Sequence, residues 1–121
     1  MAESFEEYLA AAPDAARPWL VEFWEHVRAR NADLTLTMFR GVPMFRFGGA
    51  YNKDGYVMFT AAAKHFSAHS IEFDLVAAAQ RDIAGAFGGK GAVSVKYANE
   101  DAKPVLKAYV DEVLRRRGFL A

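Results

Sequence analysis

Residues 56–61 read YVMFTA and residues 64–70 read KHFSAHS, and these two short runs decide the fold class. β-branched and aromatic residues are typical of strands, and the short connection between the runs favours an antiparallel pair. The first run is apolar on both faces, which is typical of a strand at the centre of a sheet. We therefore predict that residues 56–61 form a central strand that is covered on one side by helices and on the other by a partner.

Similar runs on either side predict three further strands, at residues 34–40, 44–47 and 93–97. Gly48-Gly49 and the Asn52–Gly55 segment supply turns between the early strands. The last run alternates apolar and polar side chains, which is the period-two pattern of a half-buried strand. Together the five runs predict a mainly antiparallel five-stranded sheet.

Helices are predicted before, within and after this set of strands. Apolar residues recur at helical spacing from residue 5 to about 12, from about residue 15, from Ser70 to about 84, and from Asp101 to Arg117. The fold class is therefore α+β, with the sheet packed against the N- and C-terminal helices.

Length and composition limit the classes of function that the chain can have. A chain of 121 residues that is 53% hydrophobic and 25% charged is expected to fold as one domain, residues 1–121. Fifteen basic residues balance fifteen acidic ones, so no nucleic-acid partner is expected. The chain has no cysteine, no basic leader and no apolar run of roughly 18 residues. We therefore expect a cytoplasmic protein without disulfides or a membrane partner.

The alternating His65, Ser67 and His69 share one face if their segment is a strand. Residues four apart on a strand are separated by about 13 Å, whereas each ligand of a zinc ion lies about 2 Å from it. The two histidines are therefore not expected to hold one ion; a role in a polar pocket and simple surface or core filling both stay open. Ser67 lacks the glycine-flanked turn of a nucleophile, and nothing in the sequence places His26 beside it as a base.

The glycine-rich segment 85–91 contains the order Gly-Gly-Lys-Gly, which is similar to part of a phosphate-binding loop. Here, however, a helix leads into a strand, and Gly91 follows Lys90 where such a loop has Ser or Thr. The segment is interpreted as a helix stop and a tight entry to the last strand. An anion beside Lys90 is the alternative.

Two further groups of side chains are candidates for binding. Glu6, Glu7 and Glu22 lie on the acidic outer sides of the first two helices, where carboxylates suit a hard cation but are also ordinary solvated residues. Aromatic residues of the strand region either line a groove or fill the core: Phe39, Phe45, Phe47, Tyr51, Tyr56 and Phe59.

Several short motifs, taken in order along nearly the whole chain, resemble the YdhG-like family of small bacterial domains. The motifs are Tyr8-Leu9 before Pro13, Gly41-Val42-Pro43-Met44-Phe45, Lys64-His65-Phe66, Gly89-Lys90-Gly91-Ala92-Val93 and the closing helix to Arg115. The resemblance implies a frataxin-like α+β fold. It implies no certain activity, because the family is mostly of unknown function and one member is proposed as an intracellular iron chaperone.

The resemblance also implies a site. Residues that stand where the family pattern has its own are expected to border one pocket with His69: Gly41, Pro43, Lys64, His65, Gly89, Lys90 and Gly91. Residues 35–38 lack the acidic residue that relatives often carry before the Gly-x-Pro motif, and Ala68-His69 replaces an apolar-Tyr pair. Both departures count against iron handling.

The leading hypothesis is therefore a non-enzymatic YdhG-like binding domain, a weak carrier of iron or of a small ligand. Its ligand would lie near Lys64, His65, His69, Lys90, Gly41 and Pro43, with Glu6, Glu7 and Glu22 as the metal candidates. The alternative is an interaction module that forms a homodimer through its sheet instead of remaining a monomer. An enzyme that depends on His65 is the third hypothesis.

Overall fold

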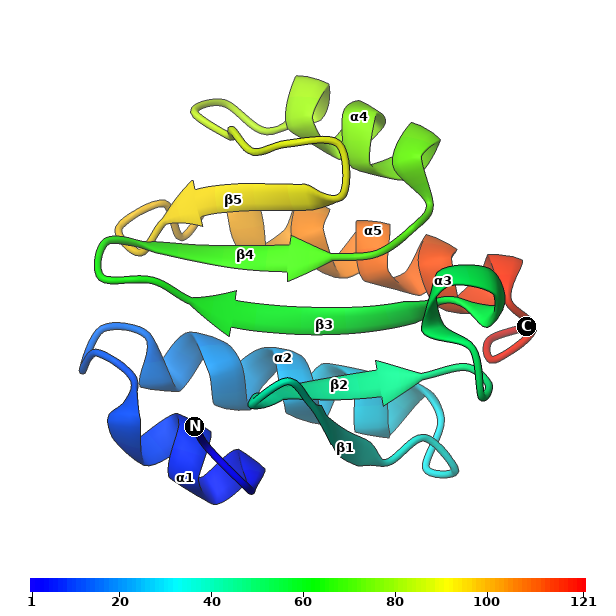
Figure 1. Cartoon of the computed structure of the whole chain (residues 1–121). Coiled ribbons are helices and arrows are strands. Elements are labelled where there is room, and N and C mark those ends of the chain that lie inside the picture. The colour runs from blue at the N-terminus through cyan, green and yellow to red at the C-terminus, as the bar shows by residue number, and fades with distance from the viewer.

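The computed structural model describes all 121 residues and contains one five-stranded sheet. The strands follow one another across the sheet in chain order, and every neighbouring pair is antiparallel (Figure 1). Their bounds are β1 Leu36–Phe39, β2 Val42–Arg46, β3 Tyr56–Ala61, β4 His65–His69 and β5 Ala92–Lys96. The predicted sheet is confirmed, and residues 56–61 form its central strand.

Five helices accompany the sheet: α1 Phe5–Ala11, α2 Arg17–Arg30, α3 Tyr51–Asp54, α4 Phe73–Asp82 and α5 Ala102–Arg116. In Figure 1, α2 and α5 lie behind the sheet, and α1 lies beside the β1 and β2 end. α4 connects β4 to β5 and packs on α5. None of the five helices has the length and hydrophobicity that a membrane crossing requires.

The core lies between the sheet and the helices behind it. The ring of Phe23 on α2 meets those of Phe59 on β3 and Phe66 on β4 at centroid distances of 5.3 and 4.9 Å. All three residues are fully buried. Burying such large rings is a major source of folding free energy, so this contact holds the central strands against α2.

Two local predictions differ from the structure. Residues 51–54 form the short helix α3 instead of a plain turn, because the Asp54 carboxylate accepts a hydrogen bond from the Ala50 N–H at 3.0 Å. The helix predicted from Ser70 begins at Phe73, because the Ser70 hydroxyl lies 2.6 Å from the hydroxyl of Tyr109 and also accepts from the Glu72 N–H. A distant tyrosine thus engages the residue that the sequence marked as a helix cap.

The connection between β1 and β2 is a two-residue turn. Phe39 pairs with Val42, and the residues between them, Arg40 and Gly41, have φ angles of 52° and 82°. Hairpin turns of this length favour left-handed backbone at both central positions. Glycine adopts that backbone freely, whereas Arg40 adopts it against a steric cost.

Candidate binding surface

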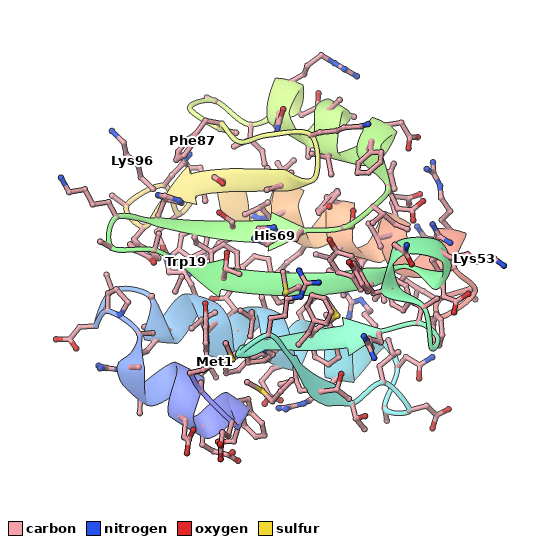
Figure 2. All side chains as sticks on the ribbon, viewed as in Figure 1. Met1, Trp19, Lys53, His69, Phe87 and Lys96 are labelled. Atoms are coloured by element: carbon pink, nitrogen blue, oxygen red, sulfur yellow. The ribbon has the colours of Figure 1, made fainter.

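The side of the sheet away from α2 and α5 carries no long helix. We define the open face as the strand side chains on this side: Thr37, Phe39, Val42, Met44, Arg46, Tyr56, Met58, Thr60, His65, Ser67, His69, Ala92, Ser94 and Lys96. The strand register aligns one residue from each strand in a row across the sheet: Thr37, Met44, Met58, His69 and Ala92. Figure 2 labels His69 near the middle of this face and Phe87 and Lys96 at its β5 side.

The open face has a one-sided charge. None of the five strands contains Asp or Glu, whereas the open face carries the cations Arg46 and Lys96. The acidic residues of this neutral chain therefore lie on helices and connections. A surface of this kind attracts anionic groups, because no carboxylate on the strands neutralises it.

Polar side chains on the β4 part of the open face bond to one another. Thr60 Oγ1 lies 2.7 Å from His69 Nε2, and Ser67 Oγ lies 2.6 Å from Ser94 Oγ. Burial lowers the pKa of His69 below its ordinary value of 6.5, so its imidazole is neutral at pH 7. As predicted, His65, Ser67 and His69 share one face, because all three alternate with residues that point into the core.

An aromatic and cationic cluster occupies the β1 and β2 side of the open face. The guanidinium carbons of Arg40 and Arg46 lie 4.9 and 5.5 Å from the centre of the Phe39 ring. The Tyr51 ring, on α3, has its centroid 4.6 Å from that of Phe39. Burial raises the pKa of the Tyr56 hydroxyl, with a further contribution from Tyr51. Its phenol therefore stays protonated near neutral pH.

The residues predicted to line one pocket lie at different places on the sheet. Gly41 is in the β1–β2 turn, and Pro43 is buried on β2, on the side that faces the helices. Lys64 is in the β3–β4 turn, beside the first residue of β4. Lys90 precedes β5, and its amine lies 4.5 Å from the centre of the Phe73 ring. The next residue, Gly91, accepts a hydrogen bond from the Ser70 N–H, near the opposite end of β4 from Lys64.

His65 and His69 occupy the two ends of β4 on the same face. His65 contacts the exposed ring of Phe87, with centroids 5.1 Å apart, whereas His69 bonds to Thr60. None of the four hollows in the molecular surface is lined by any of the six predicted ligand residues. The structure therefore brings His65 and His69 onto one surface but does not gather all six residues into a pocket.

The surface hollows lie away from the strand side chains of the open face. The largest, of about 550 Å³, lies beside Pro18, Trp19 and Tyr97. The cation at its edge, Lys103, is already paired with Glu22 and Glu100 at 3.0 Å each. This hollow therefore offers an apolar wall but no free charge.

The three candidate metal ligands are not gathered either. The Glu7 carboxylate accepts a hydrogen bond from the Glu3 N–H at 2.7 Å. Glu22 lies 2.6 Å from the amine of Lys107 and 3.0 Å from that of Lys103, and the bond to Lys107 is the main reason that the pKa of Glu22 is lowered. No group of three His, Asp or Glu side chains in the molecule is arranged to hold one metal ion.

The structure does not assemble a serine with a histidine base. His26 Nε2 lies 2.8 Å from Asp111 Oδ1, and this pair joins α2 to α5 behind the sheet. Ser67 lies on the other side of the sheet, bonded to Ser94. The His26 and Asp111 pair is therefore a contact between helices.

The predicted aromatic set divides between the core and the surface. Phe45 and Phe59 are fully buried, and Phe47 stacks on Phe119. Phe39, Tyr51 and Tyr56 contribute to the open-face cluster. Sequence reasoning missed Arg40 and Arg46 as members of this cluster; the available signal was that Arg46 is two residues from Met44 and therefore shares its face.

The strands and helices define an α+β domain with an antiparallel meander and one open face. It is similar to the crystal structure of a protein from the DUF1801 family, YdhG of Bacillus subtilis, with a TM-score of 0.71 and 19% sequence identity over 93% of this chain and 90% of that chain. Neither a family model nor a curated protein matches the sequence. The resemblance to YdhG-like domains is thus confirmed for the fold, and the frataxin-like classification stays a prediction.

Proposed function

We propose that this chain is a non-enzymatic, YdhG-like binding domain whose open face docks an acidic segment of another protein. The observation that carries the proposal is the distribution of charge: the open face has cationic side chains and no carboxylate on any of the five strands. A shallow face without a hollow suits an extended chain better than a small enclosed ligand. Charge complementarity selects an acidic segment.

Face-to-face association of two copies is less favourable than docking of an acidic segment. It would place Arg46 and Lys96 of one copy against the same cationic surface of the other. Like charges that face each other across an interface raise its free energy. We therefore do not propose a second copy of the chain as the partner of the open face. The test below must still be able to detect such a homodimer.

Iron carriage has less support from the same structure. Glu22 is engaged by two lysines, and the candidate carboxylates are not grouped with other ligands. Family-level resemblance is thus the main support for an iron carrier, whereas the charge of the open face independently supports an anionic partner.

The four methionines provide a direct test. Met44 and Met58 lie on the open-face side of the sheet, Met58 half-buried and Met44 buried just beneath the surface, whereas Met38 lies on the opposite side of β1 and Met1 is at the exposed N-terminus. In a protein labelled at the methionine methyl groups, a decaglutamate peptide should shift the NMR signals of Met44 and Met58. Met38 is the internal control and should shift much less; Met1 is not used as a control, because its side chain lies against Gly41 in the β1–β2 turn.

Two comparison titrations identify other occupants. If a thymidine decanucleotide shifts Met44 and Met58 and decaglutamate does not, the partner is a nucleic acid and the proposal is wrong. If the same two signals change with protein concentration alone, and light scattering shows a dimer, the open face is an interface between copies. Equal shifts of all four methyl groups with decaglutamate also contradict the proposal, because they indicate binding without a defined surface.

A further inference from the structure

Phe39 is held between two arginines that have no acidic partner. Six of the nine arginines form ion pairs within the chain, and Arg40, Arg46 and the exposed Arg81 of α4 do not. Arg40 and Arg46 also donate no hydrogen bond to any other group of the chain, although a guanidinium has five N–H donors. Their contact with the chain is instead through the ring of Phe39.

Arg46 differs from the other unpaired cations because part of its guanidinium group is buried. Its Nε is shielded from solvent and has no hydrogen-bond acceptor. A buried donor without a partner costs roughly 1–3 kcal/mol, so such donors normally find an acceptor. The terminal nitrogens of the same guanidinium have no acceptor in the chain either and are not shielded, so this end of Arg46 is open to an acceptor from outside.

The surroundings of Arg46 suit an incoming acceptor. Its neighbour across the strands is Tyr56, and the Tyr51 ring lies 6.1 Å from that of Tyr56. Neither tyrosine hydroxyl is used in a hydrogen bond within the chain, so both remain available as donors. The aromatic rings also displace water, which strengthens a charge-assisted hydrogen bond.

We propose that Phe39, Arg40 and Arg46 form an oxyanion-binding site, which takes a carboxylate or phosphate group of the docked segment. This inference rests on the proposed function and names the chemical group that the open face recognises. Arg46 binds the oxyanion end-on, through its two terminal nitrogens, which unlike Nε are not shielded from solvent, in a bidentate geometry that arginine forms with both anions. Arg40 adds a second positive charge from the β1–β2 turn.

The test measures the Arg46 Nε–Hε signal by NMR while inorganic phosphate or acetate is added, with chloride as the control at equal ionic strength. We expect saturation by phosphate with a dissociation constant on the order of a few millimolar, as suits one charge-assisted bidentate contact. Saturation by acetate as well assigns the site to carboxylates in general, and saturation by phosphate alone assigns it to phosphorylated groups. Chloride should cause no saturating shift.

Two variants separate a built site from general attraction between charges. Arg46→Lys keeps the positive charge but loses the bidentate geometry, and should weaken oxyanion binding roughly tenfold. Arg81→Lys, the matched control at an unpaired and exposed arginine, should leave binding unchanged. Methionine methyl spectra of both variants check that the fold is intact.

Several results would overturn the inference. Chloride producing the same shift as phosphate is one, and full affinity in Arg46→Lys is another. If Arg46→Lys binds decaglutamate as tightly as the unaltered chain, with Met44 and Met58 still shifting, the oxyanion site is wrong while the docking face stands. If decaglutamate shifts neither methyl group in the unaltered chain, the proposed function itself fails.

Discussion

The buried carboxylate of Glu72, one residue before α4, is held by the guanidinium of Arg117, one residue after α5. Arg117 Nη2 lies 2.5 Å and Nε 2.7 Å from Glu72 Oε2, and the Glu72 side chain is only 6% exposed. A second guanidinium, that of Arg116, lies 3.5 Å from the other carboxylate oxygen and also binds Asp74. The C-terminal arginines therefore fasten the end of α5 to the start of α4.

Arg117→Gln should lower the free energy of unfolding by about 2–3 kcal/mol, because it leaves a buried carboxylate with a weaker partner. Arg115→Gln is the matched control, since Arg115 pairs with the exposed Glu112 in the same helix turn. Its cost should stay below about 1 kcal/mol. Urea unfolding followed by circular dichroism measures both. If both variants lose the same free energy of unfolding, the contact between Arg117 and Glu72 stabilises the fold no more than an exposed ion pair does.

Arg40→Asn should raise the free energy of unfolding by about 0.5–1 kcal/mol, because asparagine tolerates the left-handed backbone at the first central position of the hairpin turn better than arginine does. The same variant should weaken phosphate binding at the oxyanion site. Urea midpoints and the phosphate titration give the two values. A loss of stability would mean that the contact of Arg40 with Phe39 outweighs the backbone cost.

The stability of the fold should depend on the protonation of His69. Because burial lowers the folded-state pKa of His69 below its ordinary value of 6.5, the unfolded chain takes up this proton first as the pH falls. The contribution of neutral His69 to stability is complete above pH 6.5 and is lost as the pH falls through 6.5 towards the folded-state pKa. Thermal unfolding between pH 8 and 5 should therefore show a smaller loss for His69→Gln than for the unaltered chain. Parallel curves would contradict this assignment.

Glu22→Gln should destabilise the protein without affecting any response to iron. Glu22 bonds to Lys103 and Lys107, which keep its folded pKa below the ordinary value, so this part of the stability is present at neutral pH and is lost as the pH falls through that lowered pKa. Partial exposure limits the cost to about 1 kcal/mol or less. Calorimetric titration with ferrous iron, repeated on Glu6→Gln and Glu7→Gln, should give the same result as the unaltered chain. Saturable binding that Glu22→Gln abolishes would support the iron-carrier hypothesis instead.

Strand alternation was predictable because it is a local property. Residues 65–69 alternate between polar and core-facing side chains, so the sequence already placed His65, Ser67 and His69 on one face. Likewise, Gly118 has a φ of 85° and follows the last turn of α5, as expected for a glycine that ends a helix. Such features depend on residues that lie within a few positions of one another.

The single pocket could not be derived from the sequence, because it needed the order and register of the strands. Gly41 and Lys64 lie in different hairpin turns, with Lys90 at the other end of β4, although each belongs to a motif of the same resemblance. Motif order along a chain carries no information about which turns meet in space. For the same reason the sequence predicted Ser70 as a helix cap, whereas its hydroxyl bonds to that of Tyr109, 39 residues away.

By itself, the sequence determined the α+β class, the antiparallel central strands and the face on which each strand side chain lies, since a period of two residues is set by backbone geometry alone. Only the tertiary structure decided that Arg46 reaches the ring of Phe39 and that Arg117 reaches Glu72. Both contacts join segments whose separation depends on strand register and helix packing. These are properties of the whole core and cannot be read from neighbouring residues.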